Sequence, residues 1–240
     1  MNTGPFPTRR LAACLIAAGA LSLALAVLNG CTTIAGTSSA TLVRVIDASQ
    51  NAPALDAYFG TVPIAFNFVA PSVTNYAVLG AGQATVRVYA HGSTTAAAQL
   101  TGMFSAGEQH TVFVTDEGSV YQASLLTDQS TPAPGGDISF RFLQQANATG
   151  PVDIYLLPGG TTIADAKPVL SALAPGAITP YINVAADTYQ IVIAPTGTTT
   201  GAYKGTAVQY VGGQVRTVLI VDQQLLNSPP VNVLVADDVG

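Results

Sequence analysis

The sequence predicts an all-β protein, with an N-terminal signal helix followed by two tandem immunoglobulin-like antiparallel β-sandwich domains. Two observations support this prediction. Short segments in which apolar residues occupy every second position recur after residue 31, and glycine-containing stretches bound them. The second half of the chain also repeats the first half with a period of about 100 residues, which is typical of tandem domains and too long for a solenoid.

The alternating segments locate the strands. Residues 85–89 and 109–115 alternate in the first half, and residues 189–193 and 216–221 do so in the second half. About seven such strands per half, with turn residues every ~8–12 positions, are typical of an immunoglobulin-like sandwich. No window after residue 31 keeps a capped helical period, so we expect Leu170–Leu173 to form a helical turn at most.

The first thirty residues have the pattern of an export signal. Arg9 and Arg10 precede the apolar run Leu11–Leu28, and the run closes on Leu28-Asn29-Gly30-Cys31. This ending resembles the lipobox of bacterial lipoproteins, whose cysteine is acylated and becomes the first residue of the mature protein. We therefore expect residues 1–30 to be a lipoprotein signal peptide, cleaved between Gly30 and Cys31, with Cys31 as the lipid attachment site.

Two alternatives for this segment stay open, namely an uncleaved membrane-spanning helix and a plain secretory signal. The apolar run of about eighteen residues is at the lower limit for crossing a bilayer. Thr32 follows the cysteine, and this resembles the pattern of Gram-negative lipoproteins that are sent to the outer membrane. The expected location is the cell envelope, lipid-anchored in the outer membrane, and either the periplasmic or the surface face is possible.

The rest of the chain divides by composition. We expect residues 31–40 to be a tether, residues 41–128 to be the first sandwich, residues 129–136 to be a Pro/Gly linker, and residues 137–240 to be the second sandwich. The only cysteines, at positions 14 and 31, lie in or at the end of the signal. The domains therefore depend on apolar burial and not on disulfides.

Charge excludes one class of partner. Only 9% of residues are charged and the formal net charge is −5. Nucleic-acid binders need clustered lysine and arginine, so no nucleic acid is expected. The expected partners are the membrane, through the lipid on Cys31, and an envelope protein or glycan. No cofactor and no metal are expected.

An arginine, an aspartate and a tyrosine recur in both halves. Arginine and aspartate are separated by the same spacing each time, and the residues are Arg44, Asp56 and Tyr58 in the first half and Arg141, Asp153 and Tyr155 in the second. They could form a ligand-binding pair, or the arginine on an early strand could bond the aspartate of the next strand. We favour the structural interpretation, because features kept in both copies of a repeat are usually those that the fold requires.

The first of these segments resembles a known family. Residues 44–58 look like the opening R-V-x-H/N-A-S-P-x-A-P-x-x-D-V-Y of a bacterial exported module, the domain of unknown function 4397, and Tyr76–Gly82 fits the Y-x-x-L-x-A-G segment that follows it. The sequence departs from the pattern at Asp47 and Gln50. The resemblance covers nearly all of residues 41–238, with a more degenerate second copy, and it implies no established activity.

Catalysis is not expected. Ser105, His110 and Asp116 could be enlisted as a hydrolase set, but no G-x-S-x-G turn is present. His91 belongs to no spaced ligand set. The carboxylates of Asp237 and Asp238 are expected to be solvated.

If a binding site exists, we expect it in the two longest segments without clear periodicity, Ala52–Phe68 and Ala164–Thr179. The sequence favours a lipid-anchored, non-catalytic binding module for a protein or glycan. A passive structural or spacer lipoprotein is the alternative, and a cell-wall hydrolase is less favoured.

Overall fold

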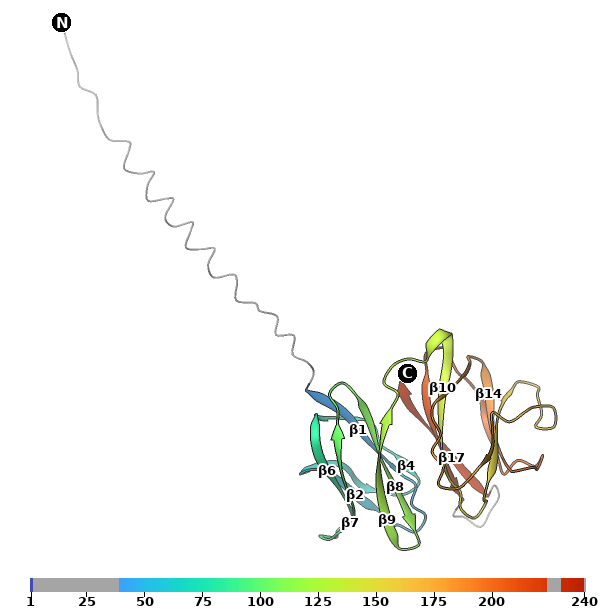
Figure 1. Ribbon diagram of the computed structural model, residues 1–240, viewed down its shortest axis with the longest axis horizontal. Coiled ribbons are helices and arrows are strands. Elements are labelled where there is room, and N and C mark those ends of the chain that lie inside the picture. The colour runs from blue at the N-terminus through green and yellow to red at the C-terminus, as the bar shows by residue number, and fades with distance from the viewer. Residues whose placement is uncertain (2–38, 224–229, 240) are drawn as a thin grey trace. The chain divides into compact units, whose positions relative to one another are not determined.

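The computed structural model describes residues 1, 39–223 and 230–239 (Figure 1). This part of the chain is all-β, as predicted, with one short 3₁₀ turn. Among the described residues, no helix has the length and apolar character needed to cross a membrane. The predicted signal peptide, Gly30 and Cys31 lie outside the described residues.

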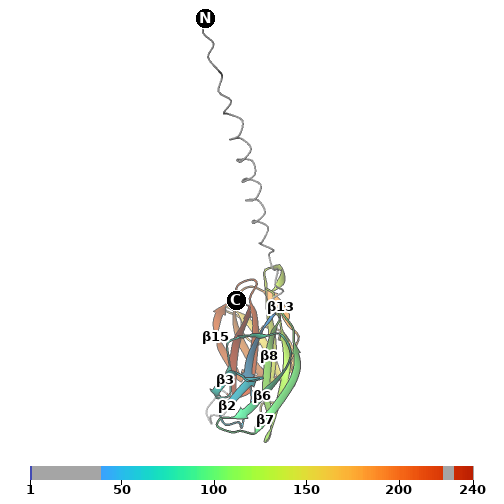
Figure 2. The ribbon, with the colours of Figure 1, turned by 90° about the vertical axis from the view of Figure 1, so that its left-hand side faces the viewer.

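Nine strands build the first sandwich, in two facing sheets. The inner sheet has the order β4-β1-β8-β9, with β5 also paired to β1, and the outer sheet has the order β3-β2-β6-β7. The strands are β1 (Ala40–Asp47), β2 (Leu55–Phe59), β3 (Val62–Phe68), β4 (Ser72–Val73), β5 (Ala77–Gly80), β6 (Gly82–Ala90), β7 (Ala96–Phe104), β8 (Gln109–Glu117) and β9 (Val120–Asp128). In Figure 2 the outer sheet is turned toward the viewer.

The second sandwich repeats this strand order. Its inner sheet is β13-β10-β16-β17 and its outer sheet is β12-β11-β14-β15. The 3₁₀ turn η1 (Pro134–Gly136) leads into it, and its strands are β10 (Asp137–Gln145), β11 (Val152–Pro158), β12 (Leu170–Leu173), β13 (Ile182–Ala185), β14 (Thr188–Pro195), β15 (Tyr203–Gln209), β16 (Val215–Asp222) and β17 (Val231–Val239).

Each inner sheet contains one parallel pair, which the prediction of antiparallel sheets missed. β1 lies parallel to β8, and β10 lies parallel to β16. Between the two members of each pair the chain visits the outer sheet twice, with a return to the edge of the inner sheet in between. Such a long crossover connection allows two strands of one sheet to run in the same direction. All other paired strands are antiparallel.

One local prediction was wrong, because Leu170–Leu173 is not a helical turn but strand β12, which pairs with β11. The segment Ala52–Phe68, which has no clear periodicity in the sequence, contains β2 and β3. Edge strand β3 has an interrupted burial pattern and register shifts against β2, so its residues lack the regular alternation by which strands are recognised in a sequence.

The inner sheets are buried on both of their faces. Val43, Val45 and Val112 point into the core of the first sandwich. On the opposite face, Ile46 and Phe113 join an apolar cluster with Leu143, Leu219 and Val221 of the second sandwich. The inner sheets therefore pack against each other, and the two sandwiches belong to one compact unit.

The linker between the sandwiches is held by backbone hydrogen bonds. The amide of Ala133 donates to the carbonyl of Gly213 at 3.0 Å, and the amide of Gly213 donates to Asp137 at 2.8 Å. Gly212 lies so close to Gly136 that a Cβ atom on it would be 2.5 Å from the Gly136 carbonyl oxygen. These contacts fix the path of the chain from β9 to β10.

Candidate binding site

The outer sheet of the first sandwich carries a concave site on the side that faces away from the core. Its volume is about 490 Å³. We call it the outer-sheet site, and it is lined by Asp56, Tyr58, Gly60, Tyr89, Gly92, Ser93 and Thr94. This volume is within the range of about 300–1,000 Å³ that is usual for small-molecule sites.

Two tyrosines on neighbouring strands form one wall of the outer-sheet site. Tyr58 on β2 and Tyr89 on β6 are both half-buried, and their rings meet edge to face with centroids 5.8 Å apart. A second ring pair lies beside Asp56, where the exposed Phe66 meets His91 at 4.9 Å, again edge to face. Because β2 and β6 are paired in register, the sheet holds the tyrosines in place.

Asp56 is buried at the base of the outer-sheet site. Its carboxylate accepts hydrogen bonds from the Asn67 amide at 2.7 Å and lies 3.0 Å from Nδ1 of His91. Burial would raise the pKa of Asp56, but these bonds and one from the Gly92 amide outweigh burial and lower it. The site therefore presents a charged carboxylate, which accepts hydrogen bonds.

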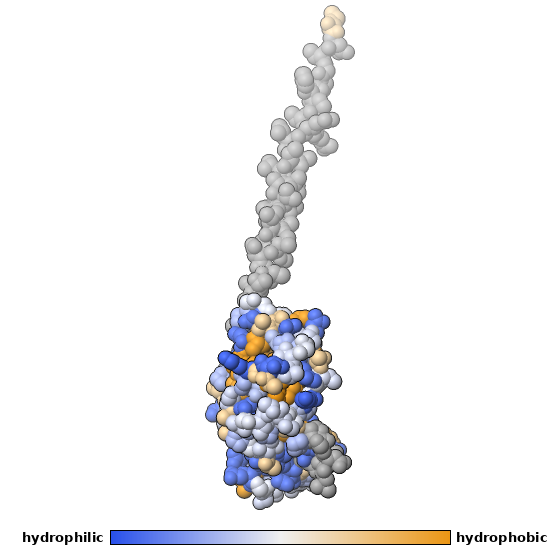
Figure 3. All heavy atoms as spheres, turned by 90° about the vertical axis from the view of Figure 1, so that its right-hand side faces the viewer, coloured by the Kyte–Doolittle hydropathy of each residue, from blue (hydrophilic) through white to orange (hydrophobic). Residues whose placement is uncertain are grey.

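The equivalent face of the second sandwich is covered. Tyr155 occupies the position of Tyr58, and its register partner is Val192 where Tyr58 has Arg87. Tyr155 is 6% exposed, and Ile163, from the segment between β11 and β12, packs over it in a small apolar cluster. Figure 3 views the protein from the side of β14, where hydrophobic groups are scattered among hydrophilic ones. Among the described residues, only those of the first sandwich leave the outward face of the outer sheet open.

The predicted pairing of each arginine with the aspartate of the next strand was wrong. Arg141 donates instead to Asp128 at 2.6 Å, and Arg44 donates to Asp238. Each bond joins one sandwich to the other, because the arginines lie on inner strands whose second face is covered by the opposite inner sheet. The aspartates of the repeated set, Asp56 and Asp153, bond residues on their own outer sheets.

A threonine and a tyrosine complete each half of this interface network. Thr111 and Tyr76 both donate to Asp128, at 2.6 and 2.7 Å. Thr217 and Tyr181 donate in the same way to Asp238, at 2.6 and 2.7 Å. The guanidinium groups of Arg44 and Arg141 also lie over the rings of Tyr76 and Tyr181, at 4.7 and 4.8 Å.

Burial sets the ionisation of this network. It raises the pKa of Tyr76 and Tyr181 far above the ordinary value, so both hydroxyls stay protonated as donors. Burial alone would lower the pKa of Arg44, but Asp238 and the other acidic neighbours raise it. The network thus pairs buried charges and hydroxyls across the two sandwiches, with the buried Nε of Arg141 left without a hydrogen-bond partner, and it has the character of a structural joint.

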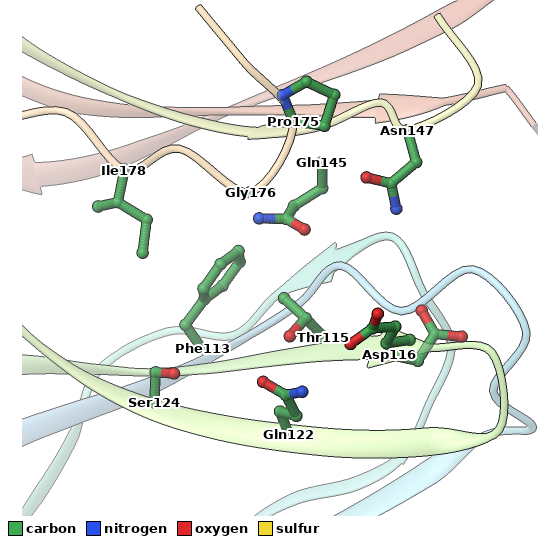
Figure 4. Close-up of a pocket in the computed structure, with 11 residues that line it drawn as sticks. Phe113, Thr115, Asp116, Gln122, Ser124, Gln145, Asn147, Pro175, Gly176 and Ile178 are labelled. Carbon is green, nitrogen blue, oxygen red and sulfur yellow. The ribbon is translucent and has the colours of Figure 1, made fainter. Parts of the chain in front are cut away.

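A second cavity lies at the edge of the same interface and has a volume of about 410 Å³. Figure 4 shows side chains of β8 and β9 on one wall and residues of the second sandwich on the other. Two carboxylates line it, and one of them, Asp116, already accepts hydrogen bonds from the amides of Gln50 and Asn51, at 2.7 and 2.9 Å. Phe113 on the same wall belongs to the apolar contact between the sandwiches. This cleft is the polar margin of the interface.

The possible hydrolase residues are not brought together. His110 is buried against the ring of Phe104, and its Nε2 accepts a hydrogen bond from the backbone amide of Ser105 at 3.2 Å. Its Nδ1 is buried without a hydrogen-bond partner, and the carboxylate of Glu108 lies 3.6 Å from Nε2, so no carboxylate holds Nδ1 as in a catalytic triad. Asp116 is bonded to a different loop, as described above. Asp238, expected to be solvated, is 5% exposed.

Comparison with known proteins finds a family that matches one part of the chain. Residues 41–155 match the family described as Domain of unknown function (DUF4397). The match confirms the predicted resemblance for this region, and it runs through the first sandwich into β11. No curated protein matches the chain.

Nine chains of solved structures match the protein. One is CBMbc, of carbohydrate-binding family CBM26, from Eubacterium rectale Amy13K, solved in complex with maltoheptaose. It is 9% identical over 82% of this chain and 96% of that chain, with a TM-score of 0.25. A likeness at this TM-score carries no argument about the ligand.

Proposed function

We propose that the protein is a lipid-anchored component of the cell envelope that binds a partner without catalysing a reaction, and that it binds through the outer-sheet site. One observation carries the proposal. The two sandwiches share a strand order, yet the second covers this face with its own chain while the first leaves it open. A concave site with rings and a charged carboxylate is suited to binding a ligand.

The anchoring half of the proposal is supported by the sequence around Gly30 and Cys31. Acylation that adds more than one chain to Cys31 would hold the protein stably at a membrane, whereas a single short chain would not. Labelling of growing cells with radioactive palmitate tests this, with Cys31→Ala as the control. Label in the parent and none in the variant is the expected result, and equal labelling of both contradicts the proposal.

The binding half is tested with envelope fragments from cells that lack the protein. The purified chain is expected to co-sediment with these fragments, and Phe66→Ala and Tyr89→Ala are expected to reduce the sedimented fraction. Val120→Ala is the matched control, since Val120 is similarly exposed but lies on β9, outside the outer sheet. Retention that is equal in all three variants would place the binding surface elsewhere.

A passive spacer is the second candidate function. The observation in its favour is the buried interface network, which makes the two sandwiches one compact unit. A spacer requires that joint and does not require the outer-sheet site. Deletion of the gene that alters envelope permeability, together with full complementation by Tyr89→Ala, would favour the spacer.

A further inference from the structure

We propose that the outer-sheet site binds a neutral sugar unit of a polysaccharide, with Tyr58 and Tyr89 as the stacking surface. This inference rests on the proposed function and specifies its ligand.

The tyrosines supply the surface that a sugar ring uses. A pyranose has C–H groups gathered on the faces of its ring, and these pack on the electron-rich face of an aromatic ring. Tyr58 and Tyr89 meet at an interplanar angle of 86°, so they present two surfaces at a right angle rather than one flat platform. Such a corner contacts one sugar unit from two sides. Each ring also carries a hydroxyl that can donate and accept hydrogen bonds.

The remaining lining residues match the hydroxyl groups of a sugar. Asp56 offers carboxylate oxygens and Thr94 an exposed hydroxyl at the rim, while the exposed hydroxyl of Ser93 already donates to the carbonyl of Thr95 at 3.1 Å. Gly60 and Gly92 have positive φ angles of 59° and 79° and no side chain to fill the site. The site is therefore hollow between its rings and its polar groups.

Charge favours a neutral sugar over an anionic one. The lining contains a carboxylate and no lysine or arginine. Asp56 is held in its charged form, because hydrogen bonds to the carboxylate outweigh the effect of burial. A phosphate, sulfate or uronate group in the site would lie beside this charge. Arg87 on β6 lies directly opposite Tyr58 on the same face of the sheet, and it is not part of the lining.

The second sandwich covers the equivalent face with its own chain. Ile163 closes it, and Val192 and Ala194 replace Arg87 and Tyr89 at the equivalent register positions. The second sandwich keeps the aspartate and one tyrosine of this face, as Asp153 and Tyr155, so it is the tyrosine pair that is confined to the sandwich in which the face is open. Burial of an apolar face explains the second sandwich, whereas it does not explain Tyr89 and the exposed Phe66 in the first.

The test is native gel electrophoresis of the full chain, purified in detergent, through gels that contain a soluble polysaccharide. Dextran, laminarin and galactomannan are the neutral probes, and polygalacturonate and heparin are the anionic probes. We expect at least one neutral probe to retard the chain. Tyr89→Ala is expected to weaken that retardation at least tenfold, and Val120→Ala is expected to leave it unchanged. Tyr89→Phe keeps the ring and is expected to retain most of the effect.

The outcomes separate this inference from the proposed function. Retardation that survives Tyr58→Ala and Tyr89→Ala in folded protein overturns the site, as does retardation by the anionic probes alone. If no polysaccharide retards the chain, yet its sedimentation with envelope fragments depends on Tyr89, the ligand is not a glycan and the proposed function stands. If Tyr89→Ala does not fold, as judged by its thermal melt, Tyr89→Leu and Phe66→Ala decide the question in its place.

Discussion

Arg141 of the second sandwich donates a hydrogen bond of 2.6 Å to Asp128, the last residue of β9 in the first sandwich. Arg44 makes the reciprocal contact with Asp238, which lies near the end of the equivalent strand β17. The contact surface is therefore self-complementary in the manner of a twofold dimer, although both halves belong to one chain. A pair of buried charges of this kind is costly to break, because removal of one partner leaves the other without compensation.

The first prediction compares two adjacent aspartates. Asp238→Ala should lower the free energy of unfolding by about 3–5 kcal/mol, because it leaves the buried Arg44 without its closest carboxylate. Asp237→Ala removes a carboxylate that is 74% exposed and paired with Arg216, so a loss of about 1 kcal/mol or less is expected. Urea denaturation of both variants measures the difference. Equal losses in the free energy of unfolding for Asp238→Ala and Asp237→Ala would show that the interface network does not stabilise the protein.

Repetition in the sequence marks several residues of this network but does not predict their contacts. Thr111 aligns with Thr217 and Tyr76 with Tyr181, and all four side chains donate to the interface aspartates. The aspartates themselves were missed. Asp128 ends the first copy, and Asp238 follows another acidic residue, which is the pattern of a solvated strand end. Residues 44 and 238 are also too far apart in the chain for any local pattern to join them.

The outer-sheet site was predictable only in part. Asp56 and Tyr58 were singled out by their repetition, and the segment from residue 52 to 68 was expected to hold a binding site. Tyr89 and Phe66 were not singled out, because an aromatic residue in a strand is as common on the covered face as on the open one. The outward face of an outer sheet is covered only in the second sandwich, by the segment between β11 and β12. This covering depends on the tertiary fold.

The second prediction concerns Asp47, whose buried Oδ2 has no hydrogen-bond partner. Burial raises its pKa from 3.8 to about 6, and the nearby Asp116 adds to this effect. The folded protein then binds the proton more tightly than the unfolded chain does. The contribution of Asp47 to the free energy of unfolding should therefore be greatest below pH 4. It should fall by roughly 3 kcal/mol as the pH rises from about 4 to 6.

Asp47→Asn should remove this fall and make the protein more stable at pH 7. An asparagine oxygen can still accept the bonds that Ser49 donates to Oδ1, and the equivalent residue of the second sandwich, Gln144, is already an amide. Thermal melts at several pH values measure the effect, with the exposed Asp187→Asn as control. A parent protein whose stability does not change between pH 4 and 6 would contradict the raised pKa.

The third prediction tests the docking of the linker. In Gly212→Ala the new methyl group would lie 2.5 Å from the carbonyl oxygen of Gly136, which is backbone and cannot rotate away. A loss of about 1–3 kcal/mol is expected from such overpacking, together with faster proteolysis in residues 129–136. Gly159→Ala is the control, because nothing lies within 4 Å of its Cβ position and its φ is not positive. Similar digestion of both variants would show that the linker is not held by this turn.

The last prediction follows from the role that the repeated aspartates have in the structure. Asp56 accepts a hydrogen bond from the amide of Asn67, and Asp153 accepts one from the amide of Ala172, at 2.7 and 2.8 Å. Asn67 and Ala172 are the non-glycine residues with positive φ in the described part of the chain, at 48° and 51°. Each aspartate thus stabilises a backbone conformation that costs an L-residue about 1–2 kcal/mol.

Asparagine tolerates this conformation better than alanine does, so the strain should be larger in the second sandwich. Ala172→Gly should therefore raise the free energy of unfolding by up to about 1 kcal/mol, even though glycine normally weakens a strand. In the control, Ala185→Gly, the exposed alanine has an ordinary φ, and a loss of about 0.5–1 kcal/mol is expected. Urea denaturation measures the change in the free energy of unfolding for both variants. Changes of opposite sign would establish the strain at Ala172, and a loss in both variants would show that Asp153 fully compensates for it.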